Sequence, residues 1–112
     1  MLNIDLHETG NGYPTIEIEK PYTLFGEFLR AEHSLPRANR LFLTVKAVLT
    51  GINNDAEVGQ DYGLLKLNRQ SGTATVWIDH LSTGIEEECE MPLKDFSDIV
   101  TAWLDYLKTR EN

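Results

Sequence analysis

Few side chains in this sequence have the spacing that catalysis or metal binding needs. The histidines His7, His33 and His80 are far apart, and none has a second His or Cys three or four residues away. That spacing would place two metal ligands on one face of a helix. Asp79 and His80 are neighbours, but adjacent side chains of a strand point to opposite faces, so they cannot form a catalytic dyad. We therefore expect no enzyme activity, no metal and no cofactor.

The single cysteine, Cys89, lies between Glu88 and Glu90. Negative neighbours raise the pKa of a thiol and disfavour the reactive thiolate. We interpret Cys89 as a small, buried residue of a strand, with a reactive thiol as the alternative. Because one cysteine cannot close an intrachain disulfide, the sequence fits a reducing compartment.

Acidic side chains are the chemistry that the chain offers in quantity. Its 112 residues include 18 acidic and 10 basic side chains, for a formal net charge of −8. Residues 1–51 carry a net charge of −1, whereas residues 52–112 carry twelve acidic and five basic side chains, a net charge of −7. Phosphate recognition uses clustered Lys and Arg, so this balance argues against direct nucleic-acid binding. It favours either a basic partner or a solvated surface.

Length and composition favour one compact domain over residues 1–112, because 41% apolar residues suffice for a core without disulfides or metal. The first ten residues include Asp5 and Glu8 where a secretion signal would have basic residues and then an apolar run. No apolar stretch reaches the 18 residues of a membrane-spanning helix. We expect a cytoplasmic protein without membrane contact, and its oligomeric state is left open.

Hydrophobic periodicity predicts a hairpin, a short helix and a strand in the first half of the chain. Apolar residues alternate on both sides of a turn signal at 10–12, which predicts a hairpin. Apolar spacings of three and four predict a helix over 22–32, and Pro36 is expected to end it. Alternation over 41–49 favours a strand, and the polar segment 55–61 is expected to be an acidic loop.

The second half of the chain predicts a meander followed by a helix. Three strands are expected, over 62–67, 73–80 and 85–91, with turn residues between them. From Leu93 onward, apolar residues recur at spacings of three and four, which indicates an amphipathic helix docked on a sheet. The order of elements predicts an α+β domain: an antiparallel sheet of about five to six strands, packed against the C-terminal helix and a short N-terminal helix.

The last predicted strand places Glu86, Glu88 and Glu90 on one face, at intervals of about 7 Å, twice the strand rise per residue. That interval resembles the spacing of successive phosphates on a nucleic-acid strand. Such a row suits a basic partner. The alternative is a solvated edge whose charges prevent edge-to-edge aggregation.

Trp77 is the aromatic residue that alternation separates from the core. It shares with Asp79 the face opposite Val76, and an exposed Trp with a charged rim is typical of a binding hot spot. Alternatively, the N-terminal hairpin or helix covers this face and Trp77 belongs to the core. The candidate partner-binding residues are aromatic and acidic: Trp77, Asp79, Glu86, Glu88, Glu90, Asp55, Glu57 and Asp61.

The order of elements over residues 60–110 gives a second indication of function. A meander is followed by an acid-rich strand that runs into Met91-Pro92-Leu93-Lys94-Asp95-Phe96, and then by a helix that contains Ala102-Trp103-Leu104. In this respect the chain resembles the small immunity proteins of bacterial contact-dependent growth inhibition and related polymorphic toxin systems. The resemblance implies a cytoplasmic protein that binds and neutralises a C-terminal toxin domain, very often a nuclease. It implies no particular contact residues.

Both lines of reasoning predict an acidic binding protein whose partner is the cognate toxin domain. A nuclease presents a basic groove to phosphates, and an acidic inhibitor could occupy that groove. Inhibition at a separate site of the toxin is equally compatible with the sequence. One alternative is an adaptor or regulatory module that uses the same face on another basic protein. Another is a small enzyme with a pocket near His80 or His33.

Overall fold

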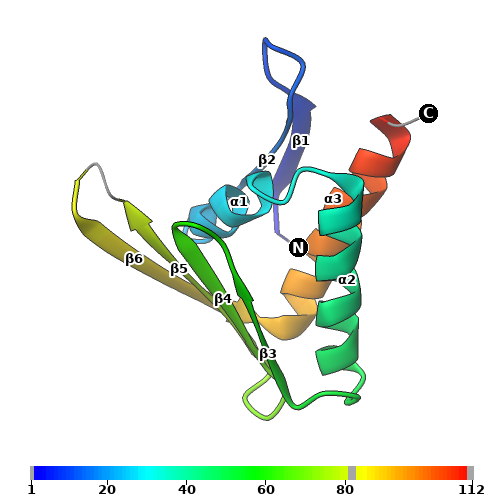
Figure 1. Ribbon diagram of the computed structural model, residues 1–112, viewed down its shortest axis with the longest axis vertical. Helices are drawn as coiled ribbons and strands as arrows, with labels where there is room; N and C mark the ends of the chain where they lie inside the picture. Colours follow the sequence, from blue (N-terminus) through cyan, green and yellow to red (C-terminus); the bar gives the residue numbers. More distant parts are fainter. Residues whose placement is uncertain (1, 81–82, 111–112) are drawn as a thin grey trace.

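The computed structural model describes residues 2–80 and 83–110 (Figure 1). The elements follow one another as β1 (Ile4–Glu8), β2 (Pro14–Ile18), α1 (Thr23–Arg30), α2 (Leu35–Leu49), β3 (Asp55–Gly59), β4 (Gly63–Asn68), β5 (Thr73–His80), β6 (Ile85–Pro92) and α3 (Leu93–Arg110). The hairpin, the first helix, the three strands of the meander and the last helix confirm the sequence-based predictions. The fold is α+β, as expected.

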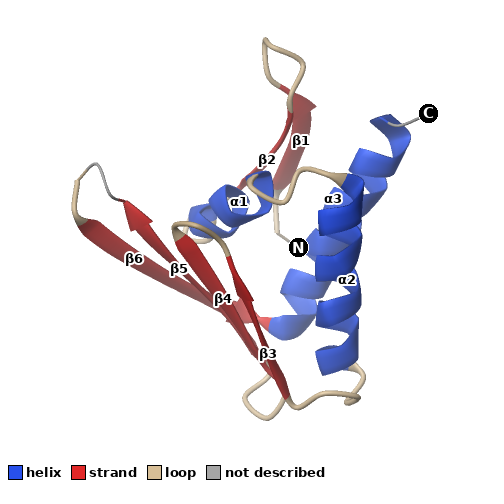
Figure 2. Cartoon of the chain, in the orientation of Figure 1, coloured by secondary structure: helices blue, strands red, loops and turns tan. Residues whose placement is uncertain are grey.

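The strands form two antiparallel sheets rather than the one sheet of five to six strands that was expected. β1 and β2 pair only with each other, and the second sheet has the order β3-β4-β5-β6. The difference arises because α1 packs on β2 and also contacts β5 and β6, which places this helix between the hairpin and the larger sheet (Figure 2). A Cβ on Gly26 would lie 3.1 Å from the carbonyl oxygen of Ile16, so glycine permits this close approach.

The prediction of a strand over 41–49 is wrong, because this segment belongs to the helix α2. Leu41, Val45 and Val48 are buried on one face at spacings of four and three, the helical repeat. Leu43, which a strand would place on the same side as Leu41, is 57% exposed. The apolar residues of this segment fit both the two-residue repeat of a strand and the three-to-four-residue repeat of a helix. Packing of α2 against α3 favours the helix.

Pro36 begins a helix rather than ending one. It lies in the first turn of α2, where a backbone N–H has no partner within the helix, so the N–H that proline lacks costs no helical hydrogen bond. Ser34 caps the same turn, and its Oγ accepts a hydrogen bond of 3.3 Å from the backbone N–H of Arg37. A single proline thus separates α1 from α2 by starting the second helix.

Part of the expected acidic loop over 55–61 is the edge strand β3. Ala56 and Val58 pack against the core, whereas Asp55 and Glu57 are exposed. This short alternation explains why the segment is a strand and not a loop. The two apolar residues bury one side of the strand, and the acidic residues face water on the other.

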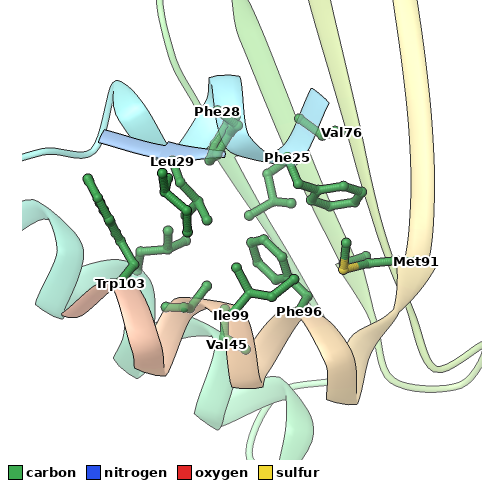
Figure 3. Close-up of a cluster of buried hydrophobic side chains, with 14 of the residues drawn as sticks. Phe25, Phe28, Leu29, Val45, Val76, Met91, Phe96, Ile99 and Trp103 are labelled. Atoms are coloured by element: carbon green, nitrogen blue, oxygen red, sulfur yellow. The ribbon is translucent and has the colours of Figure 1, made fainter. Parts of the chain in front are cut away.

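The core lies between the larger sheet and the helices (Figure 3). Phe25 of α1 meets Phe96 of α3 with ring centroids 5.3 Å apart, and Val76 and Met91 of the sheet close the same space. Trp103, just past the middle of α3, is fully buried. Helices from both ends of the chain therefore share one core with the sheet.

A buried polar contact joins the segment between α1 and α2 to α3. The indole Nε1 of Trp103 donates a hydrogen bond of 2.9 Å to the backbone carbonyl of Glu32. The Glu32 side chain is itself buried, and its Oε2 lies 2.7 Å from Nε of Arg37. Buried polar groups are stable only when paired, so these contacts hold the segment in place.

Candidate partner-binding face

The larger sheet has one face that packs on the helices and one that does not. On β4 and β5, alternation turns Leu65, Leu67, Ala74 and Val76 into the core. Their neighbours point the other way, and none of the described helices or hairpin strands lies on that side (Figure 1). We call this side of the sheet the outer face. From β3 to β6 its residues include Asp55, Glu57, Leu64, Lys66, Asn68, Thr73, Thr75, Trp77, Asp79, Glu86, Glu88 and Glu90.

Strand pairing places three of the four glutamates of β6 beside the outward residues of β5. Glu86 is opposite Asp79, Glu88 opposite Trp77, and Glu90 opposite Thr75. All three glutamates are exposed, and Glu90 Oε1 lies at the limit of hydrogen-bond distance, 3.5 Å, from the Thr75 hydroxyl. The outer face therefore has an acidic edge along β6.

Trp77 is partly buried, although none of the described helices or hairpin strands covers it (Figure 1). The helix α1 approaches β4 from the core side, where a Cβ added to Gly63 would lie 3.6 Å from Phe28 Cδ2. The hairpin β1–β2 pairs only with itself. Of the two interpretations of Trp77, the structure favours an aromatic residue that faces outward among carboxylates.

A shallow cavity of about 370 Å³ lies beside the Trp77 ring. Its side chains come from β4, β5, β6 and the turn before β4: Asp61, Tyr62, Leu64, Lys66, Trp77, Asp79 and Glu86. We call it the Trp77 pocket. Three carboxylates and one ammonium group line it, so its formal charge is −2. The volume lies at the lower end of the range for small-ligand sites.

Lys66 is the charged residue of this face that the sequence reasoning did not single out. Its Nζ lies 5.2 Å from the centroid of the Trp77 ring and 3.7 Å from Glu57 Oε1. The first distance is that of a cation–π contact. In a strand over 62–67, alternation puts Lys66 on the other face of the sheet from Leu65 and Leu67. The sequence therefore contained the pattern that places Lys66 on the outer face.

The eight predicted residues all lie on or beside the outer face, but in two groups. Asp61, Trp77, Asp79 and Glu86 meet at the Trp77 pocket, and the other two predicted glutamates, Glu88 and Glu90, continue along the β6 edge. Asp55 and Glu57 lie on β3, at the opposite edge of the sheet. In register, Asp55 is opposite Asn68 and Glu57 is opposite Lys66.

Cys89 faces the opposite side of the sheet from the acidic row. It pairs with Val76, is partly buried, and its Sγ lies 3.3 Å from the backbone carbonyl of Pro21, to which the thiol can donate. Burial raises the pKa of the Cys89 thiol. The contacts are those of a packed strand residue, the first of the two interpretations.

The histidines named for an enzyme alternative lie away from the Trp77 pocket. His33 is exposed after α1, and His80 lies at the end of β5 with its Nε2 3.5 Å from Glu87 Oε2. Neither lines the pocket. The arrangement can therefore hold a cation through carboxylates and an aromatic ring, but it offers no imidazole for proton transfer.

The potential metal ligands come together on the hairpin instead. Asp5, His7 and Glu17 have one ligand atom each, all within 4.8 Å of one another. His7 Nδ1 lies 3.4 Å from Asp5 Oδ2, and Asp5 is opposite Glu17 in the β1–β2 pair. One imidazole and two carboxylates are a donor set that Zn²⁺ accepts. Sequence spacing missed this group because only strand register joins residues ten to twelve positions apart.

Comparison of the chain with protein-family models, with curated proteins and with solved structures gives no match. Within the described residues, no helix combines the length and the apolar character needed to cross a membrane. The outer face, where an outward-facing tryptophan lies between carboxylates, is the feature of the structure that points to a function.

Proposed function

We propose that this protein binds a basic protein partner through the outer face of its larger sheet. The observation that carries the proposal is Trp77, which faces outward on an uncovered sheet and has Asp79 beside it and Glu88 opposite. A tryptophan within a charged rim has the composition of an interface hot spot. The acidic edge of β6 would complement and attract positive charge.

We further propose that the partner is the toxin domain of a bacterial contact-dependent system, a nuclease, which this protein neutralises as an immunity protein. The support is the resemblance of residues 60–110 to such proteins together with the sign of the outer-face charge. A nuclease must attract phosphates with a basic groove, and the glutamates of β6 would compete for that groove. Electrostatic attraction would also speed capture, with association rates up to about 10⁸–10⁹ M⁻¹s⁻¹ at low salt.

A rescue experiment tests this function. The C-terminal domain encoded beside this chain is expressed in a naive bacterium with the wild-type chain, with the double variant Glu86→Lys/Glu88→Lys, or with the matched variant Asp98→Lys/Asp105→Lys. Both variants change the charge by the same amount, but Asp98 and Asp105 are exposed on α3, away from the outer face. We expect the wild-type chain and the α3 variant to restore growth, and the β6 variant to fail.

Two results would contradict the proposal. A harmless neighbouring domain, or one that kills in the presence of the wild-type chain, would remove the toxin as partner. Equal rescue by both double variants would remove the β6 edge from the interface. A stable complex with a basic protein that is not toxic would support the adaptor alternative, which uses the same outer face.

A further inference from the structure

The Trp77 pocket has the features of a receptor for one positively charged side chain. A cavity of about 370 Å³ is open beside an aromatic ring, and carboxylates of Asp61, Asp79 and Glu86 surround it. These residues come from the turn before β4, from β5 and from β6, so the charges converge from different elements. A negative charge would be repelled here, and a purely apolar group would leave the carboxylates without a partner.

The structure already shows a cation on the Trp77 ring. Lys66 Nζ lies 5.2 Å from the centroid of the Trp77 ring and 3.7 Å from Oε1 of Glu57 on β3. The ring therefore already has a positive charge over its face in the free protein. Lys66 is shared between Trp77 and Glu57, so the carboxylates of Asp79 and Glu86 are left for a second cation.

A metal ion is not the cation that this pocket fits. Among residues 2–80 and 83–110, the grouping of three close ligand atoms occurs on the hairpin, not among the carboxylates of the pocket. A metal ion would also gain little from the Trp77 ring, which lines the cavity. An organic cation with a flat face uses both the ring and the carboxylates.

We propose that the Trp77 pocket binds one arginine side chain of the basic partner. A guanidinium is planar, stacks on an aromatic face, and donates paired hydrogen bonds to carboxylates, whereas a lysine ammonium is a compact point charge that does not stack. The guanidinium lies against Trp77 and donates to Asp79 and Glu86. This inference deepens the proposed function and depends on it for the origin of the arginine, but not for the chemistry of the pocket.

The test uses the full chain and three capped tripeptides, acetyl-Gly-X-Gly-amide, in which X is arginine, citrulline or lysine. Citrulline has the shape of arginine without its charge. Binding is followed by NMR at the indole N–H of Trp77, and the indole of Trp103 serves as an internal reference because it is buried and bonded to Glu32. We expect the arginine peptide to shift only the Trp77 signal, with saturation in the millimolar range.

The controls distinguish a guanidinium site from general attraction to an acidic protein. We expect the citrulline peptide to bind at least about tenfold more weakly, and Asp79→Asn to weaken arginine binding several-fold. Lys66→Met removes a competing cation and should strengthen it about threefold. Asp105→Asn, at an exposed acid of α3 away from the outer face, should change it by less than twofold. A Trp77 signal that does not move, or that moves equally with citrulline or with lysine, would overturn the assignment.

The two proposals can fail separately. If the arginine peptide binds and no toxin is neutralised, the pocket is retained and the immunity function is lost. If the chain neutralises a toxin but the arginine peptide does not shift the Trp77 indole signal, the immunity function is supported and the arginine pocket is refuted.

Discussion

Neutralising Glu86 should stabilise the free protein while it weakens the proposed partner binding. Glu86 is directly opposite Asp79 in the β5–β6 pair, and Asp79 directs its backbone N–H to Tyr62 on the β4 side. The two acids therefore form a non-hydrogen-bonded pair, the kind in which cross-strand side chains come closest. Like charges in that position destabilise the folded state, so Glu86→Gln should remove the repulsion between Glu86 and Asp79.

The expected size follows from this geometry. Two exposed carboxylates about 6 Å apart repel by about 0.7 kcal/mol in water, and 0.15 M salt reduces this by about half. Glu88 lies about 7 Å from Glu86 along the strand and adds a similar term. We expect Glu86→Gln to raise the free energy of unfolding by about 0.5 kcal/mol, which corresponds to about 2 °C in Tm for a domain of this size.

Calorimetry at three salt concentrations measures this effect. The gain in Tm should be largest at 10 mM salt, smaller at 0.15 M, and absent at 1 M, where the Debye length falls to about 3 Å. Glu57→Gln is the matched control, because it neutralises an outer-face glutamate that lies 3.7 Å from Lys66 and so removes an attraction. A lower Tm for Glu86→Gln, or a gain that persists at 1 M salt, would refute the repulsion.

Three further predictions concern the fold. Trp103→Phe should cost about 2–3 kcal/mol in thermal unfolding, because it leaves a cavity and an unpaired carbonyl, whereas Trp77→Phe should change stability by less than about 0.5 kcal/mol. Leu41→Lys should unfold the protein and Leu43→Lys should not, as measured by circular dichroism. A strand over 41–49 would instead make the two substitutions equally damaging. Burial raises the pKa of Cys89, so its alkylation at pH 8 should be slower than that of an exposed cysteine and should accelerate toward higher pH.

The elements that were predicted correctly are those whose pattern admits one period. β5 alternates strictly from Thr73 to His80, and α3 repeats its apolar residues at three and four over 18 residues. The segment over 41–49 satisfies both periods, because Leu41, Leu43, Val45 and Leu49 alternate while Leu41, Val45 and Val48 also share a helix face. Contact with α3 decides between them, and no local pattern contains that contact.

Much of the outer face could be predicted for the same reason. Alternation alone put Trp77, Glu86 and Glu88 on one side of the sheet, and the strand register agrees. The Trp77 pocket could not be foreseen, since it depends on the strand register that sets Glu86 opposite Asp79 and on the turn that brings Asp61 beside them. Lys66 was missed because its strand was predicted without assigning its faces.

The two-sided sheet also bears on how such a protein changes over evolutionary time. Every second residue of β4, β5 and β6 is free of the core, and substitutions at exposed positions of this kind usually alter stability by no more than about 0.5 kcal/mol. The outer face can therefore vary residue by residue while the inner face keeps the fold. A lineage that must follow a drifting partner could exchange its recognition surface without passing through unfolded intermediates.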